Sequence, residues 1–136
     1  MPLVLRRSLD KSLPALMGLA AEAEGFLVGA GAQAPILFKV LLALEETVRN
    51  LIEHGGESPT NRLEVCLEVG EGRAVLLIED DGPPFDPRQA PAFDPSLPLE
   101  DRVPHGMGVA LLRHFMTDIQ YERLGSRNQL RLVVES

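Results

Sequence analysis

The clearest pattern of hydrophobic and polar positions lies over residues 63–69, where apolar and polar side chains alternate. This period of two residues predicts a strand with one buried face. A Gly70-Glu71-Gly72 turn follows, and the run from Ala74 to Glu79 is then apolar almost throughout. The two segments predict a hairpin whose second strand is central in a sheet and covered.

Two helices are predicted before this hairpin. The first begins near Pro14, with Asp10 or Ser12 as its cap, and continues to about Phe26. The second covers residues 35–54 and ends at a pair of glycines, which is a common C-terminal signal.

Further elements are predicted at both ends of the chain. Residues 3–9 form an opening strand, residues 108–116 a helix, and residues 118–123 and 129–134 two final strands. This order of elements predicts an α+β fold, a two-layer sandwich in which helices back a mixed, mostly antiparallel sheet. The length of 136 residues fits one domain spanning 1–136.

An irregular segment, about residues 83–105, separates the central strand from the third helix and holds seven of the eleven prolines. A long segment of this kind within a compact domain is usually either functional or disordered. Its position between two candidate motifs predicts a mobile lid over a bound ligand. A solvated connector without a role is the alternative.

Composition excludes several classes of function. The formal net charge of −7 argues against nucleic acid as the main partner. Cys66 is the only cysteine, so no intrachain disulfide can form and a reducing compartment is favoured. No apolar run approaches the roughly 20 residues that cross a bilayer, and the first residues do not form a signal peptide. We therefore expect a cytoplasmic protein with neither nucleic acid nor membrane as partner.

The second helix carries the first candidate motif, Glu46 and Asn50, which are four residues apart and therefore share a face. We expect this face to lie apart from the core side formed by Val40, Leu44, Val48 and Leu51. An asparagine carbonyl is a hard oxygen ligand that suits Mg²⁺. A glutamate one turn earlier could orient or deprotonate an attacking water or hydroxyl. Taken alone, the pair is explained more simply as two solvated polar residues.

Asp80 and Gly82 form the second candidate motif, at the end of the predicted central strand. The Asp80 carboxylate would lie at the sheet edge, where a glycine lets the backbone approach a flat ligand closely. This carboxylate can accept a hydrogen bond from the exocyclic amine of adenine, and Gly82 would leave space for the ring. An Asx-type turn without a ligand is an equally good explanation.

Gly106 and Gly108 form the third candidate motif, before the third predicted helix. The N–H groups and dipole of a helix N-terminus favour phosphate. The segment is not a P-loop, and it is not a Rossmann fingerprint because Leu111 occupies the third glycine position. An ordinary flexible helix N-terminus is the alternative.

The order of the three motifs would place a Mg²⁺ ligand, an adenine acceptor and a phosphate cradle around one nucleotide. In this order the chain resembles the GHKL ATPase superfamily, with its Bergerat fold, and within it the anti-sigma-factor serine kinases of bacterial partner-switching systems. Residues 44–54 resemble the N box, residues 78–87 the G1 box and residues 105–112 the G2 box. Residues 121–128 resemble the closing hairpin of the subfamily.

The resemblance implies ATP and Mg²⁺ as cofactors, with Glu46 as catalytic base, Asn50 as Mg²⁺ ligand and Asp80 as the reader of adenine. It also implies nucleotide contacts from Gly82, Gly106 and Gly108. The activity that it implies is serine/threonine phosphorylation of an anti-anti-sigma (STAS-type) protein. A sigma factor or another regulator would be a further partner, and relatives of this kind often form homodimers.

Two positions depart from the superfamily pattern. Pro84 stands where much of the superfamily has a second glycine, and Asn128 stands where many relatives have a threonine near adenine. A non-catalytic module that binds nucleotide, or nothing, and occupies a partner protein is therefore an alternative function. The catalytic part of a histidine kinase acting in trans is less favoured, because the chain has no dimerising phosphoacceptor helix of its own.

Overall fold

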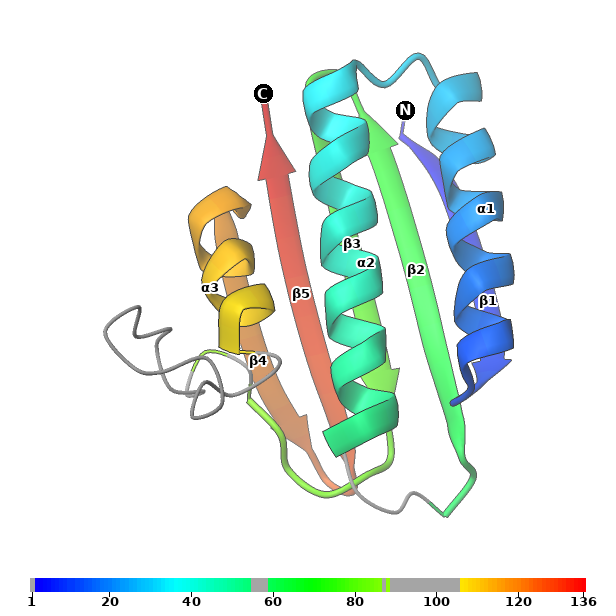
Figure 1. Ribbon diagram of the computed structural model, residues 1–136, viewed down its shortest axis with the longest axis vertical. Helices are drawn as coiled ribbons and strands as arrows, with labels where there is room; N and C mark the ends of the chain where they lie inside the picture. Colours follow the sequence, from blue (N-terminus) through cyan, green and yellow to red (C-terminus); the bar gives the residue numbers. More distant parts are fainter. Residues whose placement is uncertain (1, 55–58, 87, 89–105) are drawn as a thin grey trace.

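The helices and strands follow the order that the sequence predicts (Figure 1). The computed structural model describes residues 2–54, 59–86, 88 and 106–136. Its elements are β1 (Leu3–Asp10), α1 (Leu13–Gly29), α2 (Ala34–His54), β2 (Arg62–Gly70), β3 (Arg73–Asp80), α3 (Gly106–Phe115), β4 (Asp118–Leu124) and β5 (Arg127–Glu135).

The strands form one sheet in the order β1-β2-β3-β5-β4. Every pairing between these strands is antiparallel. The predicted antiparallel character is therefore confirmed, whereas the prediction of a mixed sheet is wrong for the described strands. β3 is the middle strand, as its apolar run predicts. Because β5 inserts next to β3, Asp80 at the end of β3 faces Asn128 near the start of β5.

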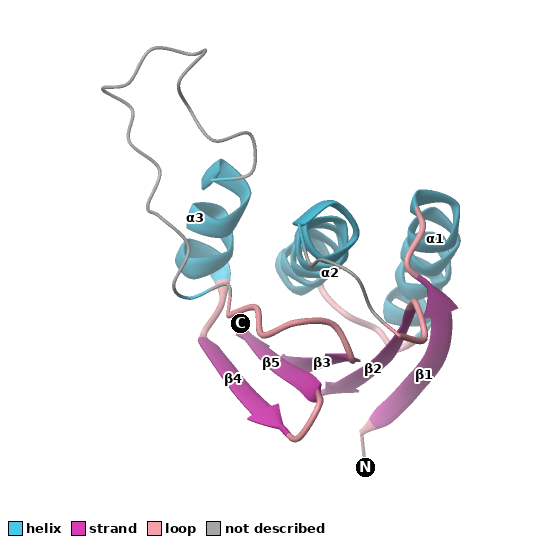
Figure 2. Ribbon diagram, turned by 90° about the horizontal axis from the view of Figure 1, so that it is seen from below, coloured by secondary structure: helices cyan, strands magenta, loops and turns pink. Residues whose placement is uncertain are grey.

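The helices lie on one face of the sheet, as the view from below shows (Figure 2). α2 lies over the middle of the sheet, with α1 on the side of β1 and α3 on the side of β4. The other face carries no helix among the described residues. This arrangement confirms the predicted two-layer α/β sandwich.

The core lies between the three helices and the inner face of the sheet. The four apolar side chains of β2 that alternate in the sequence are all buried, namely Leu63, Val65, Leu67 and Val69. They belong to one buried cluster with the apolar side of α2, where Val40, Leu44 and Val48 are at most 1% exposed. Each side chain of this size contributes about 1.5–3 kcal/mol of burial free energy.

Local signals define the element ends more closely than the periodicity does. Ser12, one of the two predicted caps, is the N-cap of α1, and its Oγ accepts a hydrogen bond from Ala15 N at 3.2 Å. α1 continues to Gly29, three residues beyond the predicted end. Gly72 has a φ of +65° at the β2–β3 turn, a conformation that glycine adopts without strain.

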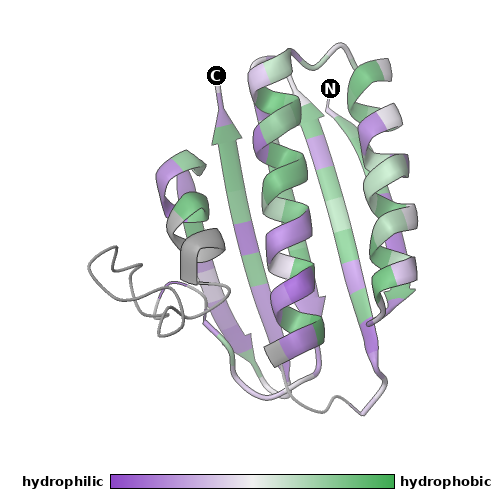
Figure 3. Ribbon diagram, in the orientation of Figure 1, coloured by the Kyte–Doolittle hydropathy of each residue, from purple (hydrophilic) through white to green (hydrophobic). Residues whose placement is uncertain are grey.

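Polar residues gather toward one end of the sandwich. In Figure 3 the first half of α2 is mainly hydrophobic, and the second half carries most of its polar positions. That second half lies toward the same end of the sheet as the close of β3 and the start of β5 (Figure 1). None of the described helices is long and apolar enough to cross a membrane.

Candidate functional site

The Asp80 carboxylate lies at the centre of a buried polar cluster at this end of the sheet. Asp80 is 2% exposed. Its Oδ1 accepts a hydrogen bond from Asn128 Nδ2 at 2.9 Å. Its Oδ2 accepts from Lys11 Nζ at 2.8 Å and from the backbone N–H of Gly82 at 3.2 Å. The contact with Gly82 is the Asx-type turn expected for this sequence.

Asn128 connects the turn after β3 to the strands beside it. Its Nδ2 also donates to the carbonyl oxygens of Gly82, at 3.3 Å, and Pro83, at 2.9 Å. Its Oδ1 accepts from the hydroxyl of Tyr121 and from Arg123 Nη1. Arg123 Nη1 donates to Gly82 O as well, at 2.6 Å. The backbone around Gly82 is therefore held by side chains of β4 and β5.

Two polar side-chain atoms of α2 are buried without a hydrogen-bond partner in the described part of the chain. They are Thr47 Oγ1 and Asn50 Oδ1, and the residues are 4% and 3% exposed. A buried unpaired acceptor of this kind costs about 1–3 kcal/mol, so it calls for an explanation. A carbonyl oxygen aimed into a site is a fitting ligand for a hard cation such as Mg²⁺. The residues present therefore fit the implied metal.

The predicted division of α2 into a packing face and a separate binding face is wrong. Asn50 belongs to the buried side together with Thr47 and Leu51, which lie three positions before it and one after it. Glu46 is half-buried at the margin of that side. The buried stripe of α2 is wide because the helix lies over the middle of the sheet, so neighbours on both sides cover it.

A narrow hollow joins the two groups of residues. Its lining includes Thr47 and Asn50 from α2, Asp80 from β3, Tyr121 and Asn128 from the last hairpin, and Phe85. The enclosed space is about 10 Å³, room for about one water molecule. Adenine could therefore bind here only if a wall of the hollow moves. Phe85 is the lining residue that comes from the predicted irregular segment, and it packs against the core.

The three predicted glycines lie in two different elements, a turn and a helix. Gly82 is buried in the Asp80 turn. Gly106 and Gly108 lie within the first turn of α3, because this helix begins two residues before its predicted start. α3 packs beside α2 (Figure 2). Most of the predicted lid, residues 87 and 89–105, lies outside the described residues.

The first described residues of the lid segment include an ion pair. Arg88 Nη2 lies 2.8 Å from Asp86 Oδ2, and Arg88 Nε donates to the same carboxylate. The hydrogen bonds and positive charge of Arg88 hold the pKa of Asp86 below its ordinary value.

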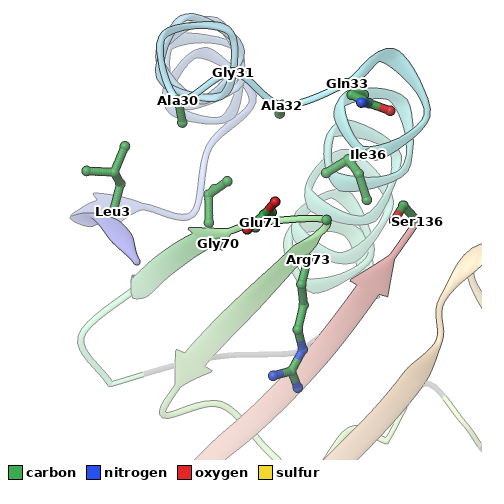
Figure 4. A pocket seen from close by; sticks show the side chains of 12 residues that line it. Leu3, Ala30, Gly31, Ala32, Gln33, Ile36, Gly70, Glu71, Arg73 and Ser136 are labelled. Carbon is green, nitrogen blue, oxygen red and sulfur yellow. The ribbon is translucent and has the colours of Figure 1, made fainter. Parts of the chain in front are cut away.

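A larger cavity lies at the opposite end of the sandwich (Figure 4). It encloses about 470 Å³ and is lined by the α1–α2 connection, the β2–β3 turn and the chain end. The charged side chains in its lining are Glu71 and Arg73. It contains none of the residues of the three motifs and none of the buried polar cluster. We therefore place the candidate site in the smaller hollow.

Two residues of the site carry no signal in the sequence. Lys11 stands in a turn between a strand and a helix, and Thr47 stands beside the motif residue Glu46. Nothing in their spacing indicates that Lys11 reaches Asp80 or that Thr47 faces the hollow. Asn128 did have a signal, because the resemblance places it where relatives have a threonine near adenine.

Comparison with known proteins shows the family of the chain. The family model of the histidine kinase-like ATPase domain matches residues 10–134 of the sequence, so the chain belongs to this family. The serine/threonine-protein kinase BtrW of Bordetella bronchiseptica is 31% identical over 105 residues, which cover 76% of this chain and 73% of BtrW. Together these matches confirm the resemblance to GHKL ATPases and to their anti-sigma-type serine/threonine kinases.

A solved structure shows the same fold. The RsbU and RsbW domains of Rv1364c from Mycobacterium tuberculosis match with a TM-score of 0.63 at 15% sequence identity. The match covers 98% of this chain and 32% of that chain. At this identity the likeness concerns the fold alone.

Proposed function

We propose that the protein is an ATP-dependent serine/threonine kinase of the anti-sigma-factor type, which phosphorylates a STAS-like anti-anti-sigma partner. The observation that carries the proposal is that one hollow brings together a buried acceptor for adenine, Asp80, and an unpaired buried carbonyl, Asn50 Oδ1. These two groups are chemically suited to the two ends of a nucleotide–metal complex.

The base and the phosphates would be held by different elements. Asp80 accepts a hydrogen bond from the exocyclic amine of adenine, while Gly82 leaves room for the ring. Asn50 Oδ1 provides a ligand for Mg²⁺, which neutralises charge on the phosphates when it is bound. The backbone N–H groups around Gly106 and Gly108, at the start of α3, receive the phosphates.

Glu46 would act as the general base. It lies one turn before Asn50 on α2, is half-buried, and directly precedes Thr47, which lines the hollow. Its carboxylate takes the proton of the partner's serine hydroxyl while that oxygen attacks the γ-phosphorus. The bond from the γ-phosphorus to the β–γ bridging oxygen breaks, and ADP leaves.

Nucleotide binding would open the hollow. Because the enclosed space is about 10 Å³, the Phe85 side chain has to move before adenine enters. Residues 83–105 are then the lid that closes over the phosphates. We further propose that the kinase acts in the cytoplasm through the domain formed by residues 1–136, that a sigma factor or another regulator is an additional partner, and that a homodimer is a possible assembly.

A second candidate is a partner-occupying module without phosphotransfer. Two observations favour it, namely the small size of the hollow and the amide of Asn128, which hydrogen-bonds to the carboxylate that would read adenine. In such a module the turn after β3 would be a rigid part of a protein-binding surface.

The test is calorimetric titration with ATP, with and without Mg²⁺. We expect the native chain to bind ATP, Asp80→Asn to lose most of the affinity, and Asn50→Ala to lose the dependence on Mg²⁺. A STAS-type partner should then acquire phosphate that is stable to acid and labile to base, as a phosphoserine is. ATP binding without any transfer would favour the second candidate, and no binding would contradict the proposed kinase.

A further inference from the structure

Lys11, which belongs to none of the three motifs, contacts Asp80, the proposed reader of adenine. It lies between β1 and α1, and its Nζ donates to Asp80 Oδ2 at 2.8 Å. The side chains of Lys11 and Asp80 are 4% and 2% exposed. The pair is therefore shielded from solvent on both sides.

Other ion pairs near β1 are different in kind. The side chains of Arg7 and Glu22 are 48% and 42% exposed, and those of Arg62 and Asp10 are 46% and 68% exposed. Surface pairs of this sort contribute little to stability. A buried pair has a larger desolvation cost, which its attraction offsets only when the geometry is good, and ordering a lysine side chain costs conformational entropy as well. Stability alone is therefore a weak explanation for Lys11.

The acceptor capacity of Asp80 indicates what Lys11 does. A carboxylate has about four lone-pair positions on its two oxygens. Within the described residues Oδ2 accepts from Lys11 and from Gly82 N–H, and Oδ1 accepts from Asn128. Lys11 and Gly82 together saturate Oδ2. One acceptor position then remains, and it is on Oδ1.

We propose that Lys11 is a positioning residue for the recognition of the adenine base, an inference that rests on the proposed function. Its ammonium holds Oδ2 and fixes the rotation of the carboxylate, so that Oδ1 presents its remaining lone pair to the exocyclic amine of adenine. A fixed, charged acceptor favours a purine that carries an amino group at position 6. It disfavours a purine with a carbonyl there, because two acceptors would face each other.

The backbone holds Lys11 in place for this role. Its N–H donates to the carbonyl oxygen of Asn61, just before β2, at 3.1 Å. The next residue, Ser12, is the N-cap of α1. Asn61 has a φ of 52°, a left-handed conformation that asparagine tolerates better than most residues. The junctions before α1 and before β2 thus set the position of Lys11 relative to β3.

The test compares two nucleotides in two lysine variants. The nucleotides are ATP and purine riboside 5′-triphosphate, which lacks only the 6-amino group. The variants are Lys11→Met and, as a matched control, Lys39→Met on α2, since Lys39 is the other lysine of the chain. Dissociation constants are measured by calorimetry with Mg²⁺ present.

We expect Lys11→Met to weaken ATP binding by about ten- to a hundredfold, as for the loss of a hydrogen bond to a charged group. The same variant should leave the weaker binding of purine riboside triphosphate unchanged, because that nucleotide does not use Asp80. Lys39→Met should bind both nucleotides as the native chain does. A general structural disturbance would instead weaken the binding of both nucleotides equally, and this result would overturn the proposal.

The double variant Lys11→Met/Asp80→Asn keeps the proposal testable if Lys11→Met alone does not fold, since it removes both buried charges. It should bind ATP as Asp80→Asn does. Weaker binding than Asp80→Asn would mean that Lys11 acts independently of Asp80, and native ATP affinity in Lys11→Met would mean that it has no role in binding. If the native chain binds no ATP at all, the proposed function fails first and the role of Lys11 fails with it.

Discussion

Asn128 on β5 lies directly opposite Asp80 on β3, and its side-chain amide donates to Asp80 Oδ1 at 2.9 Å. The same amide nitrogen donates to the carbonyl oxygens of Gly82 and Pro83. One side chain therefore orients the proposed base reader and also fixes the turn that follows it. The site depends in this way on the pairing of two strands that are far apart in the sequence.

Replacing Asn128 should reduce stability strongly. Asn128→Ala removes one hydrogen-bond donor from a buried carboxylate and from each of two backbone carbonyls. We expect the free energy of unfolding to fall by about 2–3 kcal/mol. Urea unfolding measures this change. Gln129→Ala, which removes a hydrogen bond to Glu79 on a more exposed part of the same strand, is the control and should cost less than about 1 kcal/mol. Equal losses in the two variants would contradict the central role of Asn128.

Removing the Thr47 hydroxyl should not reduce stability. Thr47→Val keeps the shape of the side chain and deletes a buried acceptor that has no partner among the described residues. We expect the free energy of unfolding to stay unchanged or to rise by up to about 1 kcal/mol. Thr117→Val is the matched control, because Thr117 Oγ1 accepts a hydrogen bond from Glu135 N, and it should be less stable than the native chain. A destabilised Thr47→Val would mean that the hydroxyl has a partner after all.

Glu46 should matter for transfer and not for binding. Glu46→Gln removes the proton acceptor but keeps the shape of the side chain. Phosphotransfer in a single turnover should fall by about 10²- to 10⁴-fold, the usual contribution of a general base. ATP affinity measured by calorimetry should change little. Glu45→Gln, an exposed neighbour on the same helix, should transfer phosphate normally. Full transfer by Glu46→Gln would refute the assigned role.

The Asp86–Arg88 pair should respond to acid. Arg88 lowers the pKa of Asp86 in the folded protein, so the pair stabilises the fold above the ordinary pKa of an aspartate. This contribution is lost as the pH falls through the lowered pKa of Asp86. In an NMR titration of the Asp86 carboxyl, Arg88→Gln should raise that pKa toward its ordinary value, whereas Arg131→Gln should leave it unchanged. The same pKa in the native chain and in Arg88→Gln would show that the pair does not form in solution.

Much of the fold follows from local pattern. The alternation over 63–69 and the apolar run after the Gly70-Glu71-Gly72 turn predicted β2 and β3, because a strand with one buried face needs that period. The helices and the last hairpin were predicted to within a few residues of their observed ends. The errors lie at helix ends, namely the end of α1 at Gly29 and the start of α3 at Gly106. The first and last turns of a helix depend on local end contacts that the hydrophobic period does not show.

The site was only partly predictable, because its residues come together across the sheet. The motif order alone indicated Glu46, Asn50, Asp80 and the three glycines as one nucleotide site, and their roles remain predictions. Sequence by itself determined the family, the order of elements and the chemistry available at each motif. Only the tertiary structure decided that Asn50 faces the core and that Lys11 and Asn128 hold Asp80. Burial and contact between distant residues depend on how the elements pack, and no local pattern encodes the position of a lysine relative to a strand some seventy residues away.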